Sequence, residues 1–326
     1  MQYFFRLSLL SILLTLPTFP KEIKPAFRLK TEGLVNDFVL DGNYLYVGTD
    51  DGLVEIFNIQ TRKKVDEISI TAEKSAMGDW VNPKILSVDR NNGKTLIVSS
   101  SMDGYRNVWI HDGKKLKRLI SAEKKITIKE ARFIDSENIF YGTLAYDVAN
   151  YALAEGYRTY SKQIEQSTFS DMALSEDKKS VVTASESGQV TVMDVKTGKI
   201  LKQPKPLNLD NIYKVDYKNG NIITAGQDRR VGVYPKNGKP YYLKSNFLVY
   251  CAALSPSGNI GVYSANENND LQLFKVNGGT KTHILLGQDS VPSTIKFFDE
   301  DGFFSAGCGY TVYYWYLKNY NLPNKK

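Results

Sequence analysis

Residues 35–59, VNDFVLDGNYLYVGTDDGLVEIFNI, contain the pattern that decides the fold. Apolar and polar residues alternate until Asp41-Gly42-Asn43, a second apolar run ends at Asp50-Asp51-Gly52, and a third run contains Phe57. Alternation of this kind predicts half-buried strands. Gly, Asn and Asp suit the turns between them because these residues tolerate positive φ. The stretch therefore predicts three antiparallel strands joined by two tight turns.

The same pattern recurs six more times along the 326 residues, in residues 83–110, 128–153, 169–195, 212–234, 249–276 and 292–317. Each third strand holds a bulky residue, in chain order Phe57, Trp109, Tyr151, Met193, Tyr234, Phe274 and Trp315. These residues are 40 to 42 positions apart, except for a first step of 52. Repeats of this length with three clear strands and a looser fourth are typical of propeller blades. Helical repeats would need a period of 3.6 residues, which these segments lack.

The ends of the chain complete the predicted fold. After the third strand of the seventh repeat only residues 318–326 remain, so its fourth strand must come from elsewhere. The alternating segment Ala26-Phe27-Arg28-Leu29 precedes the first repeat and can supply that strand, which would remove an exposed sheet edge. We therefore predict an all-β fold, a seven-bladed β-propeller of WD40-like repeats, closed by an N-terminal strand.

The repeats resemble WD40 repeats over essentially the whole chain after its first residues. The resemblance lies in Leu174-Ser175-Glu176-Asp177, in Leu254-Ser255-Pro256-Ser257-Gly258, in the Asp-Gly turns and in the third-strand aromatic residue. The Gly-His element of that family is absent, because the chain has only His111 and His283. A His-centred hydrogen-bond tetrad is therefore expected to be lost from nearly every blade.

The first residues carry an export signal. Arg6 is followed by the apolar run of residues 7–16, which Pro17 interrupts. Ten residues are too short to span a bilayer but fit the apolar core of a signal peptide. We expect residues 1–20 to be a cleaved Sec signal peptide, 21–320 the propeller and 321–326 a polar C-terminal tail, with a periplasmic mature chain that has no membrane span. An uncleaved anchor is the alternative.

The formal net charge of +7 comes from basic residues that are scattered along the chain. The densest cluster is Lys114, Lys115, Lys117 and Arg118. A nucleic-acid-binding protein usually concentrates Lys and Arg on one face or helix, so we expect no nucleic acid as a partner. A solvated basic surface is the simpler interpretation, and such a surface could also favour an acidic protein partner.

The residue inventory favours no catalytic chemistry. Metal sites need clustered His, Cys, Asp or Glu, and two isolated histidines with Cys251 and Cys308 do not supply one. No phosphate-binding Gly-rich loop is present, and a Ser-His-Asp triad would depend on His111 or His283 alone. We expect a non-enzymatic protein with no catalytic residue, no metal and no cofactor. The two cysteines permit one disulfide or two small buried residues.

The innermost strand of each predicted blade lines a central channel. On these strands Asp37, Arg132, Lys214 and Lys296 are expected to meet near a channel mouth. They bring mixed charges without an obvious acid–base pair, so ordinary channel lining is the favoured interpretation. A propeller enzyme of the lactonase or sugar-hydrolase type that uses these residues is the alternative function.

An insertion at residues 71–82, TAEKSAMGDWVN, accounts for the step of 52 residues. It places Met77 and Trp80 among polar residues, and an aromatic residue with a Met in a surface loop is typical of interface anchors. We therefore predict a protein-interaction role for Met77 and Trp80. The alternative is that Trp80 packs back onto the first or second blade.

The combination of an export signal, seven degenerate blades and a missing His tetrad resembles the NapL family of propeller accessory proteins, which are encoded with periplasmic nitrate reductase. The segment Asp50-Asp51-Gly52-Leu53-Val54-Glu55-Ile56-Phe57 is one of those that carry the resemblance. It implies a periplasmic scaffold that supports maturation of the reductase or electron transfer to it, with reductase components as protein partners. No functional residue of that family is carried over.

Overall fold

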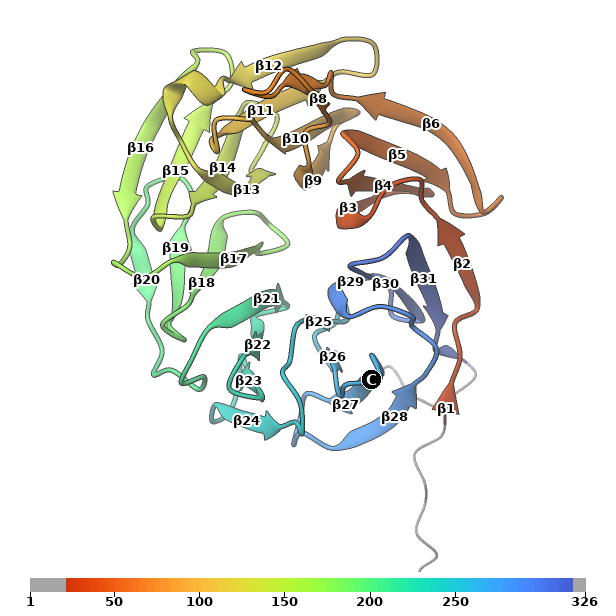
Figure 1. Ribbon diagram of the computed structural model, residues 1–326. Helices are drawn as coiled ribbons and strands as arrows, with labels where there is room; N and C mark the ends of the chain where they lie inside the picture. The colour runs from red at the N-terminus through yellow and green to blue at the C-terminus, as the bar shows by residue number, and fades with distance from the viewer. Residues whose placement is uncertain (1–21, 319–326) are drawn as a thin grey trace, which may run out of the picture.

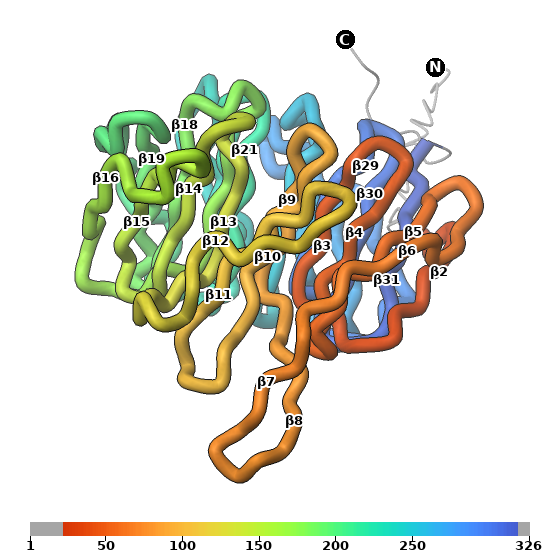
Figure 2. Tube along the Cα trace, turned by 90° about the horizontal axis from the view of Figure 1, so that it is seen from above, coloured from red at the N-terminus to blue at the C-terminus, as the bar shows by residue number. Residues whose placement is uncertain are grey.

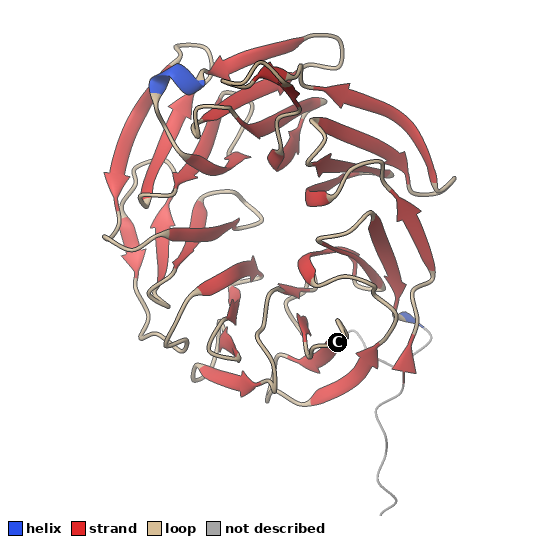
Figure 3. Cartoon of the chain, viewed as in Figure 1, coloured by secondary structure: helices blue, strands red, loops and turns tan. Residues whose placement is uncertain are grey.

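In a computed structural model, which describes residues 22–318, seven sheets are arranged in a ring around a central axis (Figure 1). Strands and loops make up nearly all of this part of the chain, and η1 (Ala122–Lys124) is a short 3-10 turn (Figure 3). Within residues 22–318, none of the helical segments is long and apolar enough to cross a membrane. The predicted signal peptide and C-terminal tail lie outside the described residues.

Seven sheets correspond to the seven predicted repeats and confirm the predicted propeller. Blades 1 and 2 contain β3 (Val35–Asp41), β4 (Tyr44–Thr49), β5 (Leu53–Asn58) and β6 (Lys63–Ser69), then β9 (Ile85–Asn91), β10 (Lys94–Ser100), β11 (Arg106–His111) and β12 (Leu116–Ile120). Blades 3 and 4 contain β13 (Ile128–Phe133), β14 (Asn138–Thr143), β15 (Asp147–Ala152) and β16 (Tyr157–Gln163), then β17 (Phe169–Leu174), β18 (Ser180–Ser185), β19 (Val190–Asp194) and β20 (Ile200–Lys202). Blades 5 and 6 contain β21 (Ile212–Lys218), β22 (Asn221–Gly226), β23 (Arg230–Tyr234) and β24 (Tyr241–Lys244), then β25 (Ala252–Leu254), β26 (Ile260–Ser264), β27 (Leu271–Lys275) and β28 (Lys281–Leu285). Blade 7 contains β29 (Pro292–Asp299), β30 (Gly302–Gly307) and β31 (Thr311–Tyr316).

The fourth strand of blade 7 is β2 (Phe27–Lys30), which confirms the predicted closure. It pairs antiparallel with β31, in a register that runs from Phe27 opposite Tyr314 to Lys30 opposite Thr311. The preceding strand β1 (Glu22–Ile23) was not predicted, and it pairs parallel with β28 of blade 6. The N-terminal segment therefore joins two neighbouring blades at the far end of the chain.

The hydrophobic core is divided into clusters that lie between neighbouring sheets. Between blades 7 and 1, for example, Leu29 and Phe304 pack with Phe38. Gly48 shows how closely blades 1 and 2 approach, because an added Cβ would lie 2.6 Å from Cγ2 of Ile85. Each blade is consequently stabilised by its two neighbours, as expected of a radial repeat.

Side-chain amides connect inter-blade loops to their blades. In blade 7, Trp315 Nε1 donates to Ser305 Oγ at 2.7 Å, and Ser305 Oγ donates to Gln288 Oε1 at 2.7 Å. In blade 5, Asn208 accepts from Thr224 Oγ1 at 2.6 Å and donates to an oxygen of Asp228 at 2.9 Å. An amide can replace a neutral imidazole here because it offers both a donor and an acceptor.

Leu29 tests the closure, since its side chain is buried between blades 7 and 1. Replacing Leu29→Ala removes buried methyl groups at the closing strand, and we expect urea unfolding to show a loss of about 2–5 kcal/mol. The neighbouring exposed Lys30→Ala is the control and should change stability by no more than about 0.5 kcal/mol. Equal effects of the two changes would mean that β2 contributes no core packing.

Candidate functional site

Acidic side chains on the inner strands connect neighbouring blades near the axis. Each accepts a hydrogen bond from a backbone N–H on the inner strand of the next blade. The pairs are Asp37 with Val88 at 3.0 Å, Asp89 with Phe133 at 2.7 Å, Glu130 with Met172 at 3.3 Å, Asp171 with Val215 at 2.8 Å and Asp216 with Leu254 at 2.8 Å. We call Asp37, Asp89, Glu130, Asp171 and Asp216 the inter-blade carboxylates. The sequence analysis singled out only Asp37 among them. The other four also lie at alternating positions of inner strands, and this alternation could have identified them.

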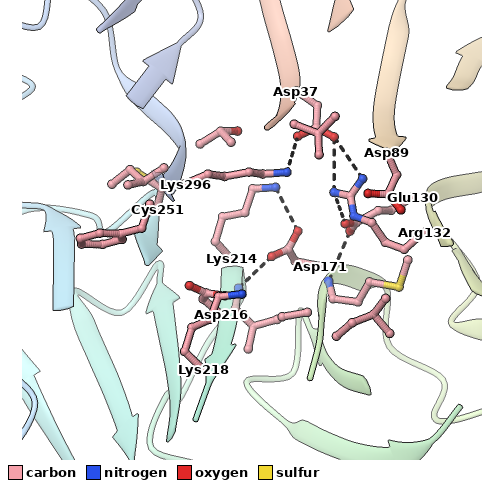
Figure 4. Close-up of a pocket in the computed structure, with 18 of the residues that line it drawn as sticks. Asp37, Asp89, Glu130, Arg132, Asp171, Lys214, Asp216, Lys218, Cys251 and Lys296 are labelled. Carbon is pink, nitrogen blue, oxygen red and sulfur yellow. Dashed lines mark hydrogen bonds and ion pairs between the residues drawn. The ribbon is translucent and has the colours of Figure 1, made fainter. Parts of the chain in front are cut away.

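Three cations neutralise part of this buried charge. Arg132 lies between Asp37 and Glu130, with Nη2 3.3 Å from Asp37 Oδ2 and in an ion pair with Glu130 Oε1. Lys296 Nζ is 3.5 Å from Asp37 Oδ1, and Lys214 Nζ is 3.0 Å from Asp171 Oδ1. The structure thus brings Asp37, Arg132, Lys214 and Lys296 into one cluster, as Figure 4 shows.

The cluster shifts the pKa values of its members in opposite directions. Burial alone would raise the pKa of Asp37, but Lys296, Arg132 and Lys214 outweigh it and lower the pKa to about 2. Burial raises the pKa of Glu130 to about 7 against the attraction of Arg132. Burial lowers the pKa of Lys296, and Asp37 offsets part of that effect. Asp37 is therefore a firmly ionised anion, whereas Glu130 takes up a proton near neutrality.

The cluster lines a cavity of about 410 Å³. Besides the charged groups its wall contains Val39, Met172, Ile295 and Phe297. It also reaches Glu176, in the turn after β17, so it extends toward the ends of the inner strands. A volume of this size lies within the range of small-molecule sites, roughly 300–1,000 Å³.

A second feature lies at the opposite ends of the inner strands, where residues 71–82 project from the ring as a hairpin (Figure 2). Its strands are β7 (Glu73–Lys74) and β8 (Trp80–Val81), which pair antiparallel. Met77 is 93% and Trp80 67% exposed, so Trp80 does not pack back onto blade 1 or 2. Its ring instead lies 5.3 Å from Lys74 Nζ, on the hairpin itself.

The remaining residues with reactive side chains do not assemble into a site. Cys251 is buried in the cavity wall and Cys308 is exposed, and both thiols are free. Burial raises the pKa of the Cys251 thiol to about 12, which disfavours a reactive thiolate. Across residues 22–318, no group of three or more His, Cys, Asp or Glu side chains is arranged to hold a metal ion.

No protein-family model and no curated protein sequence matches the chain. Among solved structures it is similar to the β-propeller domain of Cps50 (Swd1) from Myceliophteria thermophila, with a TM-score of 0.71 and 13% identity. The alignment covers 90% of this chain and 99% of that one. At this identity the likeness shows the fold alone, which is a WD40-like seven-bladed propeller.

Asp37→Asn tests whether the cluster holds the blades together. The change leaves the buried cations Arg132 and Lys296 without their shared anion, so we expect urea unfolding at neutral pH to show a loss of about 3 kcal/mol. Asp41→Asn on the same strand is the control, because Asp41 pairs with Arg90 while its side chain is 45% exposed. An exposed pair contributes about 1 kcal/mol or less. A control as destabilised as Asp37→Asn would contradict a structural role of the cluster.

The unmodified chain and Asp37→Asn also give a test of the pH dependence. The pKa of Asp37 in the folded state, about 2, lies below the ordinary value of 3.8. The ionised carboxylate therefore stabilises the fold fully above pH 3.8. That contribution is lost as the pH falls toward 2. We therefore expect the stability difference between the unmodified chain and Asp37→Asn to shrink by about 2 kcal/mol over this interval, measured by urea unfolding. A difference that stays constant would refute the lowered pKa.

Proposed function

We propose that the chain is a non-enzymatic scaffold, exported to the periplasm, whose projecting hairpin anchors a protein partner. The observation that carries the proposal is the exposure of Met77 and Trp80 on a segment that leaves the ring (Figure 2). Large apolar side chains held in water are costly unless a partner covers them. Trp is moreover among the residues most enriched at the energetic centres of interfaces.

The hairpin is held at its base by one carboxylate. Glu73 accepts from Ser101 Oγ at 3.1 Å, from Met102 N at 3.0 Å and from Asn107 Nδ2 at 3.3 Å. These three donors belong to blade 2, so the carboxylate fastens β7 to the ring. A segment fixed in this way loses less conformational entropy when it binds than a loose loop would.

The tip of the hairpin is ordered as well. Ser75 Oγ accepts from the backbone N–H groups of Met77 at 3.2 Å and Asp79 at 3.1 Å. Gly78 provides the positive φ of +91° that the turn requires. Met102, also exposed, adjoins the hairpin base, so the hairpin surface consists of Met77, Trp80, Val81 and Met102.

The channel cluster supports a scaffold over a hydrolase. General acid–base catalysis needs a side chain that can reach a proton of the substrate. Both oxygens of Glu130 and both oxygens of Asp171 are already engaged by backbone N–H groups or by cations. A pKa shifted by such a structural ion-pair network does not by itself indicate catalysis.

The sequence resemblance to the NapL family supports a more specific partner. We infer that the hairpin surface binds a component of the periplasmic nitrate reductase system, during its maturation or while it receives electrons. The export signal in residues 1–20 and the degenerate blades support this inference, because they are the features that the resemblance rests on.

The test is capture by the tagged mature chain from periplasm of cells that respire nitrate. We expect a reductase component to be recovered, and Trp80→Ala combined with Met77→Ala to reduce its recovery at least about tenfold. Leu201→Ala is the matched control, since Leu201 is 52% exposed on the outer strand of blade 4 and should leave recovery unchanged.

Both variants alter exposed side chains, so their thermal midpoints should match that of the unmodified chain. Recovery that is equal for the hairpin variant and the unmodified chain would refute the hairpin as the docking surface. Recovery of a partner unrelated to nitrate reduction, with the hairpin dependence intact, would refute only the identity of the partner.

A further inference from the structure

The channel cavity carries an inference that is independent of the hairpin. The two carboxylates that face its lysines are committed within the protein. Asp37 Oδ2 accepts from Val88 N and contacts Arg132, while Asp37 Oδ1 faces Lys296. The two oxygens of Asp171 are taken by Val215 N and Lys214. Asp37 and Asp171 therefore have little left to offer to a ligand that donates hydrogen bonds.

Its donors, in contrast, have spare capacity. A lysine ammonium has three N–H donors. Among the described residues, Lys214 Nζ has Asp171 as its hydrogen-bond partner, whereas Lys296 Nζ has the long contact of 3.5 Å to Asp37 and lies 5.9 Å from the centre of the Phe38 ring. In Figure 4 both side chains point into the cavity, Lys296 toward Asp37 and Lys214 toward Asp171. Two like charges that face one cavity are stabilised by an anion that lies between them.

Two further observations describe the wall around them. Thr294 is buried and lines the cavity, and its Oγ1 has no hydrogen-bond partner among the described residues. A buried hydroxyl without a partner is unfavourable, so a ligand that forms a hydrogen bond with it gains binding energy. Leu174 and Phe297 bring apolar surface to the same cavity. An anionic group with an apolar portion would match this wall.

We propose that the channel cavity binds a small organic monocarboxylate, whose carboxylate lies between the ammonium groups of Lys214 and Lys296 and accepts from Thr294 Oγ1. The apolar portion of the ligand packs against Leu174 and Phe297. The site is separate from the hairpin surface, so the ligand and a protein partner could bind to the chain at the same time.

The charge balance of the cavity wall disfavours more than one negative charge on the ligand. The cavity wall contains six acids, Asp37, Asp89, Glu130, Asp171, Glu176 and Asp216, and five bases, Arg132, Lys178, Lys214, Lys218 and Lys296. From blade 6 the cavity wall contains Cys251 and Ala252, and the raised pKa of the Cys251 thiol keeps it protonated. The wall therefore has one excess negative charge, which protonation of Glu130 removes. A dianion would be repelled more strongly by the inter-blade carboxylates.

The experiment uses hexanoate as the probe, with ligand-observed NMR and calorimetry on the mature chain. Acetate lacks the apolar portion, hexylamine reverses the charge, and sulfate adds a second negative charge. We expect hexanoate to bind at millimolar concentration or below, and each of the other three probes to bind at least about tenfold more weakly. Hexylamine that binds as tightly as hexanoate would overturn the proposal, as would an absence of hexanoate binding.

Variants locate the site. Lys214→Met and Lys296→Met should each weaken hexanoate binding at least about tenfold, since each removes one charge-assisted hydrogen bond. Thr294→Val keeps the shape of the side chain and removes only the hydroxyl, so it tests the site even if a lysine variant fails to fold. Lys179→Met, at an exposed position that does not line the cavity, is the control and should bind as the unmodified chain does. Unchanged binding in folded variants of Lys296 and Thr294 would overturn the proposal.

The pH dependence is a second readout of the same site. Because an added anion favours the protonated form of Glu130, hexanoate should bind more tightly at about pH 6 than at about pH 8. Glu130→Gln should remove most of that dependence while hexanoate still binds. A dependence that is unaltered in Glu130→Gln would show that the anion is bound elsewhere. None of these results bears on partner capture by the hairpin.

Discussion

The hydrogen bond from a backbone N–H on one inner strand to a carboxylate on the preceding blade is the interaction on which the rest of the channel depends. An inner strand has a neighbouring strand on one edge only, and the N–H groups on its other edge are buried near the axis. A buried N–H without an acceptor costs about 1–3 kcal/mol. Carboxylates such as Asp37 and Asp171 remove that cost across the gap between blades. Burying an ionised carboxylate is itself unfavourable, and ion pairs with Arg132, Lys214 and Lys296 offset that cost.

The need for buried acceptors, and then for cations that neutralise them, explains why the channel looks like an active site. Buried acids, a carboxyl with a pKa near 7 and a cavity are the usual signs of catalysis. Here each acid is already committed to holding two blades together, and the cations that neutralise the acids are the groups with unused donors. The chemistry left to the channel is recognition of an acceptor. We propose that recognition of a protein falls to the hairpin, the described segment that leaves the ring and carries exposed Met77 and Trp80.

The repeat, the blade count and the closing strand were predictable because they depend on local alternation and turn residues, which a sequence displays directly. Contacts between blades were harder to predict, since they join residues about 40 positions apart whose partners are often backbone atoms. Glu130 and Asp171 were missed for that reason. In the second turn of blade 3, Tyr146, and not a Gly or Asn, adopts the positive φ of +58°. Its hydroxyl is bonded to Thr183 in blade 4, so tertiary structure overrides the local preference.

Closure links the fold to the proposed export. Residues 22–30 follow the predicted signal directly in sequence, yet they complete blades 6 and 7, and Arg28 donates to the carbonyl of Gly287 across 259 positions. Such non-local pairing forms late, because the entropy of closing a long loop must be overcome before its contacts are gained. A ring in this state lacks the packing of Leu29 against blades 7 and 1 and leaves β31 without its outer partner. Late closure of the ring is compatible with the proposed export, because a Sec substrate crosses the membrane before it is fully folded.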